Sequence, residues 1–208
     1  MVWAGAVGPQ DRLARRYAEF GPGALMAFPP GDIFGEEHIA VGPACLIAAE
    51  VSLSVGMTPG QPLPPGVTSP VLRIGARTSI GRGSHVVAHR SIVIGADVMT
   101  GPGCYITDQN HRYADPATPI GQQWPSEDPV EIGPGSWLGA GAIVLPGTRL
   151  GRNTVVAAGA VVRGEFPDHA VLAGVPARVI RRYDPETGWR PGLREVRVDP
   201  PEGWPGTR

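Results

Sequence analysis

The sequence has no lysine, few aromatic residues and almost no net charge. All 18 basic side chains of the 208-residue chain are arginines, aromatic residues make up 6% of it, and the formal net charge is -1. Nucleic-acid binding requires a basic face, so no nucleic-acid partner is expected. Any phosphate group would be bound by arginine, whose planar guanidinium can donate to two oxygens at once.

Cysteines and long apolar runs are also scarce. The two cysteines, Cys45 and Cys104, are too few for the disulfide framework of a small secreted domain. Both occupy a repeat position that otherwise holds small residues, so we interpret them as packed free thiols. The N-terminal residues lack the basic-then-apolar order of a signal peptide, and no apolar run approaches the roughly 20 residues of a membrane span. We therefore expect a cytoplasmic protein without a membrane span.

What the sequence does contain is a six-residue period. It starts at Val41, is interrupted, returns at Ile74 and runs to Val162 with a second interruption. Position one is aliphatic and position five is small or β-branched, so both should point inward. Position four is repeatedly Gly, Asn or Asp, which tolerate the left-handed backbone of a tight corner. Such a period indicates a solenoid, here an all-β triangular prism of parallel sheets whose coils bury their interior by stacking.

The period also divides the chain. Residues 1–40 are predicted to form an N-terminal extension, with a short helix possible over residues 11–20. Residues 41–182 form the β-helix, with loops at 59–70 and 112–129, and residues 183–208 form a C-terminal tail. The pattern leaves open whether residues 33–57 continue the main prism, and whether the cap at 177–183 is helical or extended.

A resemblance to a known family is carried by the repeats and by three segments within residues 73–182, namely ITDQNHRYADPATPIGQQ, IGPGSWLGAGAIVLPGTRLG and VLAGVPARVIR. The sequence is similar to the hexapeptide-repeat acyltransferases, in particular the branch that O-acetylates sugars, which includes galactoside/maltose and surface-polysaccharide types. The resemblance implies a left-handed β-helix, a homotrimer with active sites between subunits, acetyl-CoA as the acyl donor, a small-molecule or glycan acceptor and no metal.

One histidine fits the chemistry that this resemblance implies. A hydroxyl attacks a thioester only as its proton is removed, and histidine suits that task because its pKa lies near neutrality. Of the five histidines, only His111 lies where a repeat opens into a long loop and follows an asparagine as in the family. We assign it as the general base. The group that orients its ring is left open among Asp108, Asp115, Glu127 and any backbone carbonyl.

The predicted acceptor site consists of His89, Asp108 and Trp124. His89 falls close to a position that binds the acceptor sugar in the galactoside branch, although the family residue there is often a carboxylate. An outward-facing strand residue is the alternative for His89. Trp124 lies in the loop, where a flat aromatic face could pack against a sugar.

The predicted donor site also follows from the resemblance. Trp137 lies beside the acyl site, or packs between subunits. A backbone N–H of Gly139 or Ala140 would stabilise the oxyanion. The remaining predicted contacts are backbone groups of Ala140 and Ala158 for the pantetheine amides and basic side chains for the phosphates, namely Arg163, Arg178 and Arg181.

Other functions fit the same repeat. The acceptor could be an amino sugar or an antibiotic, or the chain could be a non-catalytic β-helix scaffold that binds no acetyl-CoA. A γ-type carbonic anhydrase shares the solenoid but needs three zinc-binding histidines. The spacing of His85, His89 and His111 does not fit that family.

Overall fold

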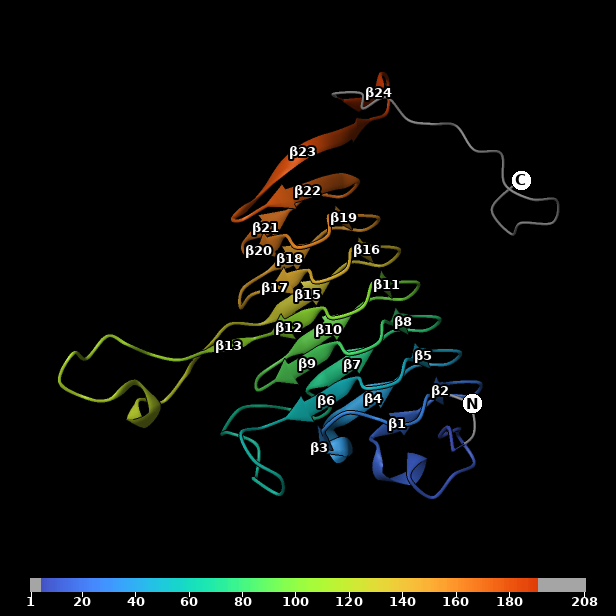
Figure 1. Cartoon of the computed structure of the whole chain (residues 1–208), viewed down its shortest axis with the longest axis vertical. Helices are drawn as coiled ribbons and strands as arrows, with labels where there is room; N and C mark the ends of the chain where they lie inside the picture. The colour runs from blue at the N-terminus through green and yellow to red at the C-terminus, as the bar shows by residue number, and fades with distance from the viewer. Residues whose placement is uncertain (1–4, 191–208) are drawn as a thin grey trace.

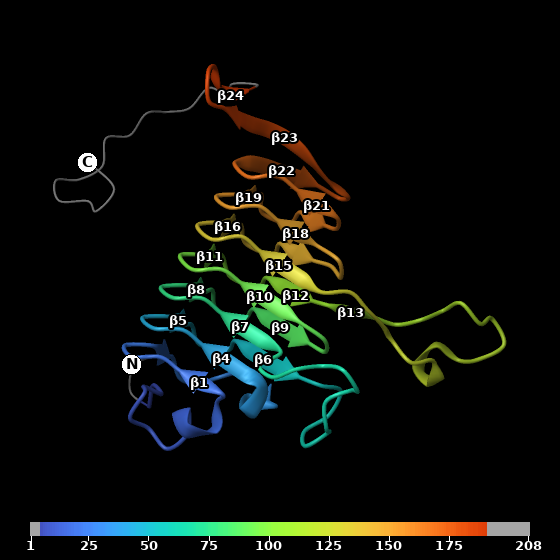
Figure 2. The same cartoon turned by 180° about the vertical axis from the view of Figure 1, so that it is seen from behind.

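The computed structural model describes residues 5–190 and forms a triangular prism (Figure 1, Figure 2). Three sheets of parallel strands make its faces, and the chain passes from sheet I to sheet II to sheet III in each coil. Figure 1 shows the N-terminal coils at one end, the later coils stacked above them, and one long loop projecting from the side. Each coil therefore hydrogen-bonds only to the coils before and after it.

The strands are short. Sheet I contains β1 (Glu19–Phe20), β4 (Ile39–Val41), β7 (Leu72–Ile74), β10 (Ile92–Ile94), β15 (Val130–Ile132), β18 (Arg149–Leu150) and β21 (Glu165–Phe166). Sheet II contains β2 (Leu25–Met26), β5 (Leu46–Ile47), β8 (Ser79–Ile80), β11 (Met99–Thr100), β16 (Trp137–Leu138), β19 (Val155–Val156), β22 (Ala170–Gly174), β23 (Ala177–Asp184) and β24 (Gly188–Arg190). Sheet III contains β3 (Ile33–Phe34), β6 (Ser52–Val55), β9 (His85–Ala88), β12 (Tyr105–Thr107), β17 (Ile143–Val144) and β20 (Val161–Val162).

The interior of the prism follows the six-residue period. The aliphatic residues at position one form the buried core along the whole stack. Position five also points inward, where small hydroxyl side chains bond to the next coil: Thr78 Oγ1 donates to the carbonyl of Gly95 at 2.7 Å, and Ser136 Oγ donates to that of Gly151 at 3.2 Å. Cys45 and Cys104 are buried free thiols at this position, as predicted. Burial raises the pKa of both thiols above the ordinary value.

The corners follow the same period. Every residue that the sequence placed at position four for its tolerance of a left-handed backbone has a positive φ, from 49° at Asn153 to 78° at Gly147. Arg77 adopts φ 57° at the same position, and its guanidinium pairs with Asp97 one coil later at 2.6 Å. The corner geometry is therefore set by the repeat and does not require glycine at every coil.

Two of the three edges of the prism matter for the candidate site. The edge where sheet II turns into sheet III, called here the plain edge, consists of the tight corners at 81–84, 101–104, 139–142 and 157–160. The edge where sheet III turns into sheet I, called here the loop edge, includes residues 88–91, 108–129, 145–148 and 163–164. The two edges are the opposite borders of sheet III.

The N-terminal part differs from the sequence prediction. Strands β1, β2 and β3 pair with β4, β5 and β6, so the prism begins well before residue 41, and residues 33–57 belong to it. The helix considered over residues 11–20 is only a 3₁₀ turn, η1 (Ala14–Arg16), because Glu19 and Phe20 join sheet I. So short a segment gains little from helix formation alone. A second 3₁₀ turn, η2 (Glu36–His38), leads into β4.

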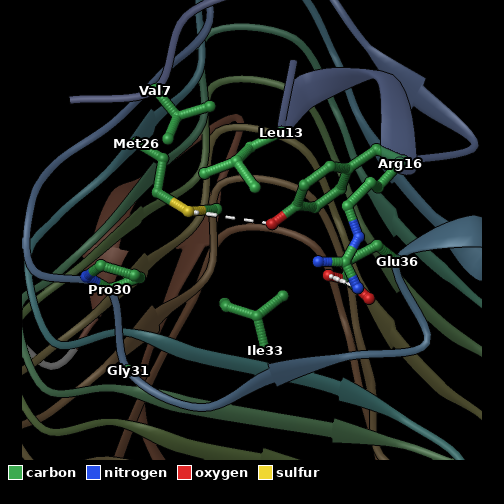
Figure 3. Close-up of a pocket in the computed structure, with 9 residues that line it drawn as sticks. Val7, Leu13, Arg16, Met26, Pro30, Gly31, Ile33 and Glu36 are labelled. Carbon is green, nitrogen blue, oxygen red and sulfur yellow. Dashed lines mark hydrogen bonds and ion pairs between the residues drawn. The ribbon is translucent and has the colours of Figure 1, made fainter. Parts of the chain in front are cut away.

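A cavity of about 260 Å³ lies in this N-terminal part, remote from the projecting loop (Figure 3). Apolar side chains, including Val7, Leu13 and Ile33, line most of it. Arg16 and Glu36 form an ion pair of 3.0 Å at one side, and Tyr17 Oη donates a long hydrogen bond of 3.8 Å to Met26 Sδ. The cavity is part of the packing of the first coil.

At the other end the stack is closed by a reversed strand. The cap predicted at 177–183 is extended: β23 runs antiparallel to β22, and β24 pairs antiparallel with β23. The predicted tail, residues 183–208, contains the end of β23 and all of β24. Its residues 191–208 lie outside the described part of the chain.

Candidate active site

The projecting loop leaves the prism through a narrow two-stranded neck. Strands β13 (Gln109–Asn110) and β14 (Ser126–Glu127) pair antiparallel and carry residues 111–125 between them, including the 3₁₀ turn η3 (Ile120–Gln122). Both views show the loop on the opposite side from β8, β11 and β16 (Figure 1, Figure 2). The loop therefore starts at the loop edge, in the middle coils of the stack.

His111 is the first residue beyond this neck. It is exposed, and its backbone N–H donates to Asn110 Oδ1 at 2.9 Å. Together with Asn110, Glu127 and Arg163 it lines a cavity of about 260 Å³ against the loop edge. Tyr113, which sequence reasoning did not single out, also lines it, and nothing in the repeat pattern indicated this. The cavity places an imidazole, a carboxylate and a guanidinium around one polar space.

Asp108 stabilises the backbone turn that follows β9, next to the base of the loop. It is 0% exposed, and its carboxylate accepts three backbone N–H groups, from His89 at 2.8 Å, Arg90 at 2.8 Å and Ser91 at 2.6 Å. Burial raises the pKa of Asp108, and the three N–H donors oppose that rise. The carboxylate therefore holds the backbone turn that follows β9.

Glu127 reaches from the neck to His89. Its Oε1 lies 2.5 Å from Nδ1 of His89, a residue that is 1% exposed. His89 is therefore not an outward-facing strand residue: it lies just past β9, and its ring is buried against Glu127 and Trp124 of the loop. Trp124 is 55% exposed and its ring centroid lies 5.8 Å from that of His89.

All three carboxylates considered as partners for His111 are engaged elsewhere. Asp108 binds the backbone, Glu127 binds His89, and Asp115 accepts hydrogen bonds from Ala117 N and Thr118 Oγ1 within the loop. Within the described residues, neither ring nitrogen of His111 has a hydrogen-bond partner. Sequence reasoning named Glu127 but missed its partner, because the two residues are separated by a 38-residue stretch of chain.

The residues predicted for the donor lie elsewhere on the prism. Trp137 is 46% exposed on the outer face of sheet II, beside Met99 in the neighbouring strand. Ala140 and Ala158 are exposed on the plain edge, one coil apart. Of the two oxyanion candidates, Gly139 already donates its N–H to Val156 O at 2.7 Å. In the described chain the N–H groups of Ala140 and Ala158 donate to no acceptor.

The three arginines predicted for the phosphates do not form one cluster. Arg163 lies at the loop edge, in the wall of the His111 cavity. Arg178 is exposed on β23, and its Nη1 donates to Ala177 O at 2.9 Å. Arg181, also on β23, lies 5.6 Å above the ring of Trp189. Within one chain, the structure thus brings His111 together with Arg163 but leaves Trp137, Ala140 and Ala158 on another side.

Comparisons with known proteins agree with this architecture. Residues 129–164 match the family described as bacterial transferase hexapeptide (six repeats). The chain is 39% identical over 110 residues to WbbJ of Escherichia coli, provisionally named a lipopolysaccharide biosynthesis O-acetyl transferase, covering 50% of this chain and 56% of WbbJ. It is 38% identical over 99 residues to a galactoside O-acetyltransferase of Lactococcus lactis, covering 48% and 47%. The chain thus spans about half the length of these curated relatives.

A solved structure extends the comparison to most of the chain. A variant of AntD, an N-acyltransferase from Bacillus cereus crystallised with dTDP and coenzyme A, superposes with a TM-score of 0.68 over 85% of this chain and 90% of that one. Sequence identity is 17%, so this likeness concerns the fold. The predicted left-handed parallel β-helix and the resemblance to hexapeptide-repeat acyltransferases are confirmed. In the described residues no helix has the length and apolarity needed to cross a membrane.

Proposed function

We propose that this hexapeptide-repeat chain is an acetyl-CoA-dependent O-acetyltransferase that acts on a hydroxyl of a sugar or glycan. The observation that supports it most is His111, held by a closed two-stranded neck at the mouth of a polar cavity of about 260 Å³. The similarity to proteins named for O-acetyl transfer on galactosides and in lipopolysaccharide biosynthesis supports the acceptor class.

The chemistry requires one proton transfer and one acyl transfer. His111 removes the proton of the acceptor hydroxyl as its oxygen attacks the thioester carbonyl carbon of acetyl-CoA. The tetrahedral intermediate then collapses by breaking the carbon–sulfur bond, and the imidazolium returns the proton to the leaving thiolate. The products are the acetyl ester and CoA. A free backbone N–H such as that of Ala140 would stabilise the oxyanion, since the N–H of Gly139 is engaged.

The donor would lie along the plain edge. The N–H of Ala158 can donate to a pantetheine amide, the carbonyl of Ala140 can accept from one, and Trp137 gives an apolar wall next to them on sheet II. Arginines on β23, Arg178 among them, would meet the phosphates further along the stack. No metal is required for this chemistry.

The donor groups and His111 lie at opposite borders of sheet III, so one chain does not bring them together. The outward residues of sheet I are mostly charged and form ion pairs, such as Arg149 with Glu131 at 2.6 Å. The outward column of sheet III is uncharged apart from the titratable His85, and consists of Ser52, His85, Tyr105, Ile143 and Val161. Its uncharged surface makes sheet III better suited than sheet I to pack against other copies. The outward column of sheet II is uncharged too, but it carries Trp137, which is proposed to line the donor site.

A homotrimer with sheet III facing the three-fold axis would complete the site. In that arrangement the loop edge of each copy lies next to the plain edge of the following copy, because the two edges are the borders of the same sheet. A closed ring of this kind uses two different surfaces at each contact. The loop of one copy would then carry His111 to the thioester bound along its neighbour.

The test is an acceptor screen with acetyl-CoA and detection of the released thiol. Mono- and oligosaccharides should release CoA, while matched amino sugars test the competing N-acetyl activity. A thermal shift with acetyl-CoA is the companion measurement, because a ligand that binds only the folded state raises its stability. If acetyl-CoA neither raises the melting temperature nor releases thiol with any acceptor, the chain is a non-catalytic scaffold and the proposal is wrong.

A further inference from the structure

A histidine and a glutamate that the proposed chemistry does not use are buried together at the neck of the loop. We call His89 and Glu127 the neck pair. Their side chains are 2% and 11% exposed and lie 2.5 Å apart, Nδ1 to Oε1. Nε2 of His89 is also buried and has no hydrogen-bond partner among the described residues. The carboxylate accepts from Nδ1, so the unpartnered atom is the far side of the ring.

Stability alone does not account for such a pair. A buried charged or polar pair is often no more stabilising than apolar residues of similar volume, and an unpartnered buried nitrogen adds a further cost. The same coil has apolar residues at the neighbouring inward positions, such as Ala88 and Ile92. A buried polar contact at this point is better explained by the two parts of the molecule that it joins.

The neck pair connects the rigid prism to the loop. His89 follows β9 and is fixed from below, since its backbone N–H donates to the buried Asp108 at 2.8 Å. Glu127 belongs to β14, the strand by which the loop returns. Trp124, three residues earlier on the same returning segment, contacts the His89 ring with centroids 5.8 Å apart. Two side chains of the returning segment, those of Trp124 and Glu127, therefore contact the buried ring of His89.

The other contacts of the neck are few. Next to Glu127, the backbone N–H of Asp128 donates to Asp108 O at 2.8 Å, and the carbonyl of Asp128 accepts from Gly147 N–H at 3.0 Å. Strands β13 and β14 pair over only two residues each, and a two-stranded ribbon of this length is marginal by itself. Ser126 Oγ adds one exposed hydrogen bond of 3.3 Å to Asn110 O. Glu127 also lines the cavity that contains His111. The position of Glu127 thus sets both the closure of the neck and one wall of that cavity.

We propose that the neck pair is a positioning device: His89, through Glu127, fixes the loop so that His111 is held in its reactive position. His89 is a positioning residue and touches neither acceptor nor donor. The effect on catalysis rests on the proposed function, whereas the effect on the loop does not. Small displacements of a reacting group cost about 100-fold in rate, so the loop must be fixed well.

Two substitutions of the same histidine separate positioning from mere packing. In His89→Asn the amide nitrogen can occupy the place of Nδ1 and still donate to Glu127. In His89→Gln it lies nearer the place of Nε2, and Glu127 keeps only its longer ion pair of 4.0 Å with Arg90. Both are uncharged and similar in size, so a role in packing alone predicts similar results for both. Glu127→Ala removes the contact from the loop side and leaves the buried turn of the prism intact, in case His89→Gln does not fold.

The first measurement needs no activity. Hydrogen exchange of the loop, residues 111–125, should accelerate by about 10-fold or more in His89→Gln and Glu127→Ala, and much less in His89→Asn, while the sheets keep their protection. His38→Gln, which alters a histidine near the N-terminal coils, is the control and should leave the loop unchanged. Equal loop exchange in wild type, His89→Gln and Glu127→Ala would overturn the proposal.

The second measurement uses acetyl transfer. In His89→Gln and Glu127→Ala, kcat should fall by about 10- to 100-fold with little change in KM for acetyl-CoA, and His89→Asn should recover most of it. If kcat in His89→Asn and His89→Gln falls equally, the pair only stabilises the fold. If wild type transfers no acetyl group at all, the proposed function fails, and the exchange experiment still decides whether the pair fixes the loop.

Discussion

The loop edge and the plain edge of the prism are built from the same repeat but present different groups. The plain edge keeps tight corners, and there the backbone N–H groups of Ala140 and Ala158 have no acceptor within the described residues. The loop edge interrupts the repeat with a long insertion, and buries Asp108, His89 and Glu127 beneath it. One edge thus offers backbone donors at regular spacing, and the other offers side chains that a regular corner could not hold.

This difference suggests that neighbouring chains contribute different parts of one site, the donor-binding groups from the plain edge and the reactive group from the loop edge. Regular corners suit a long, repetitive ligand such as pantetheine, because identical donors recur at each coil. The insertion suits a single reactive group, because its position is set by specific side-chain contacts. The predictions below test each edge in turn and the face of the prism between them.

The largest effect is expected from His111→Ala, which removes the reactive group of the loop edge. kcat should fall by about 10²- to 10⁴-fold, the usual contribution of a general base. The affinity for acetyl-CoA should stay nearly the same, because the groups proposed to bind it lie on the plain edge. Steady-state kinetics and titration calorimetry measure the two quantities. Turnover near that of wild type would refute the assignment of His111.

A charge on sheet III should prevent the copies from assembling. The loop edge of one copy would then no longer lie next to the plain edge of another. Ile143→Glu places a carboxylate in the middle of the uncharged outward column, and should reduce the mass seen by sedimentation about threefold. Val93→Glu makes a similar change on the charged face of sheet I and is the matched control. A wild-type monomer, or an assembly that survives Ile143→Glu, would contradict the orientation proposed for sheet III.

Asp108→Ala should destabilise the loop edge without touching the plain edge. The substitution leaves three backbone N–H groups buried without an acceptor, which should lower the free energy of unfolding by about 2–5 kcal/mol. Denaturant unfolding measures it. Asp115→Ala, which removes an exposed loop carboxylate, should change stability much less. Equal stability of wild type and Asp108→Ala would mean that the turn after β9 finds other acceptors.

The smallest effect is expected on the donor side. Arg178→Ala should raise KM for acetyl-CoA by about 3- to 10-fold and leave kcat nearly unchanged, because it removes one of several charge-assisted contacts to phosphate. Arg182→Ala, on the same strand, is the comparison variant. An unchanged KM in Arg178→Ala would remove this residue from the donor site.

Sequence and structure agree where the repeat is regular. The inward aliphatics, the inward Thr78 and Ser136, and the left-handed corner at Asn153 could all be predicted, because each coil repeats the same local constraints. The first coils were missed because the period is regular there only from Phe20 to Met26, and the chain departs from it before Ile33. Their place depends on pairing with the next coil.

The candidate site was predictable only in part. His111 could be found because the period stops at it. The burial of His89 could not, since it lies just past a strand, where a two-residue shift of the period hides which way the side chain points. Its contact with Glu127 spans the whole loop, and no local pattern encodes a contact of that range. Whether His111 and Ala140 share one site depends on other copies of the chain.

The reversed strand β23 has a consequence for the length of the assembly. A stack of parallel coils ends in a row of unpaired backbone groups, and such an edge can recruit another molecule and grow into a fibre. In sheet II, β23 covers this row with an antiparallel strand that carries Arg178, Arg181 and Arg182. A second prism arriving at this end would meet the wrong strand direction and a line of like charges. The cap therefore disfavours end-to-end growth through this end of sheet II.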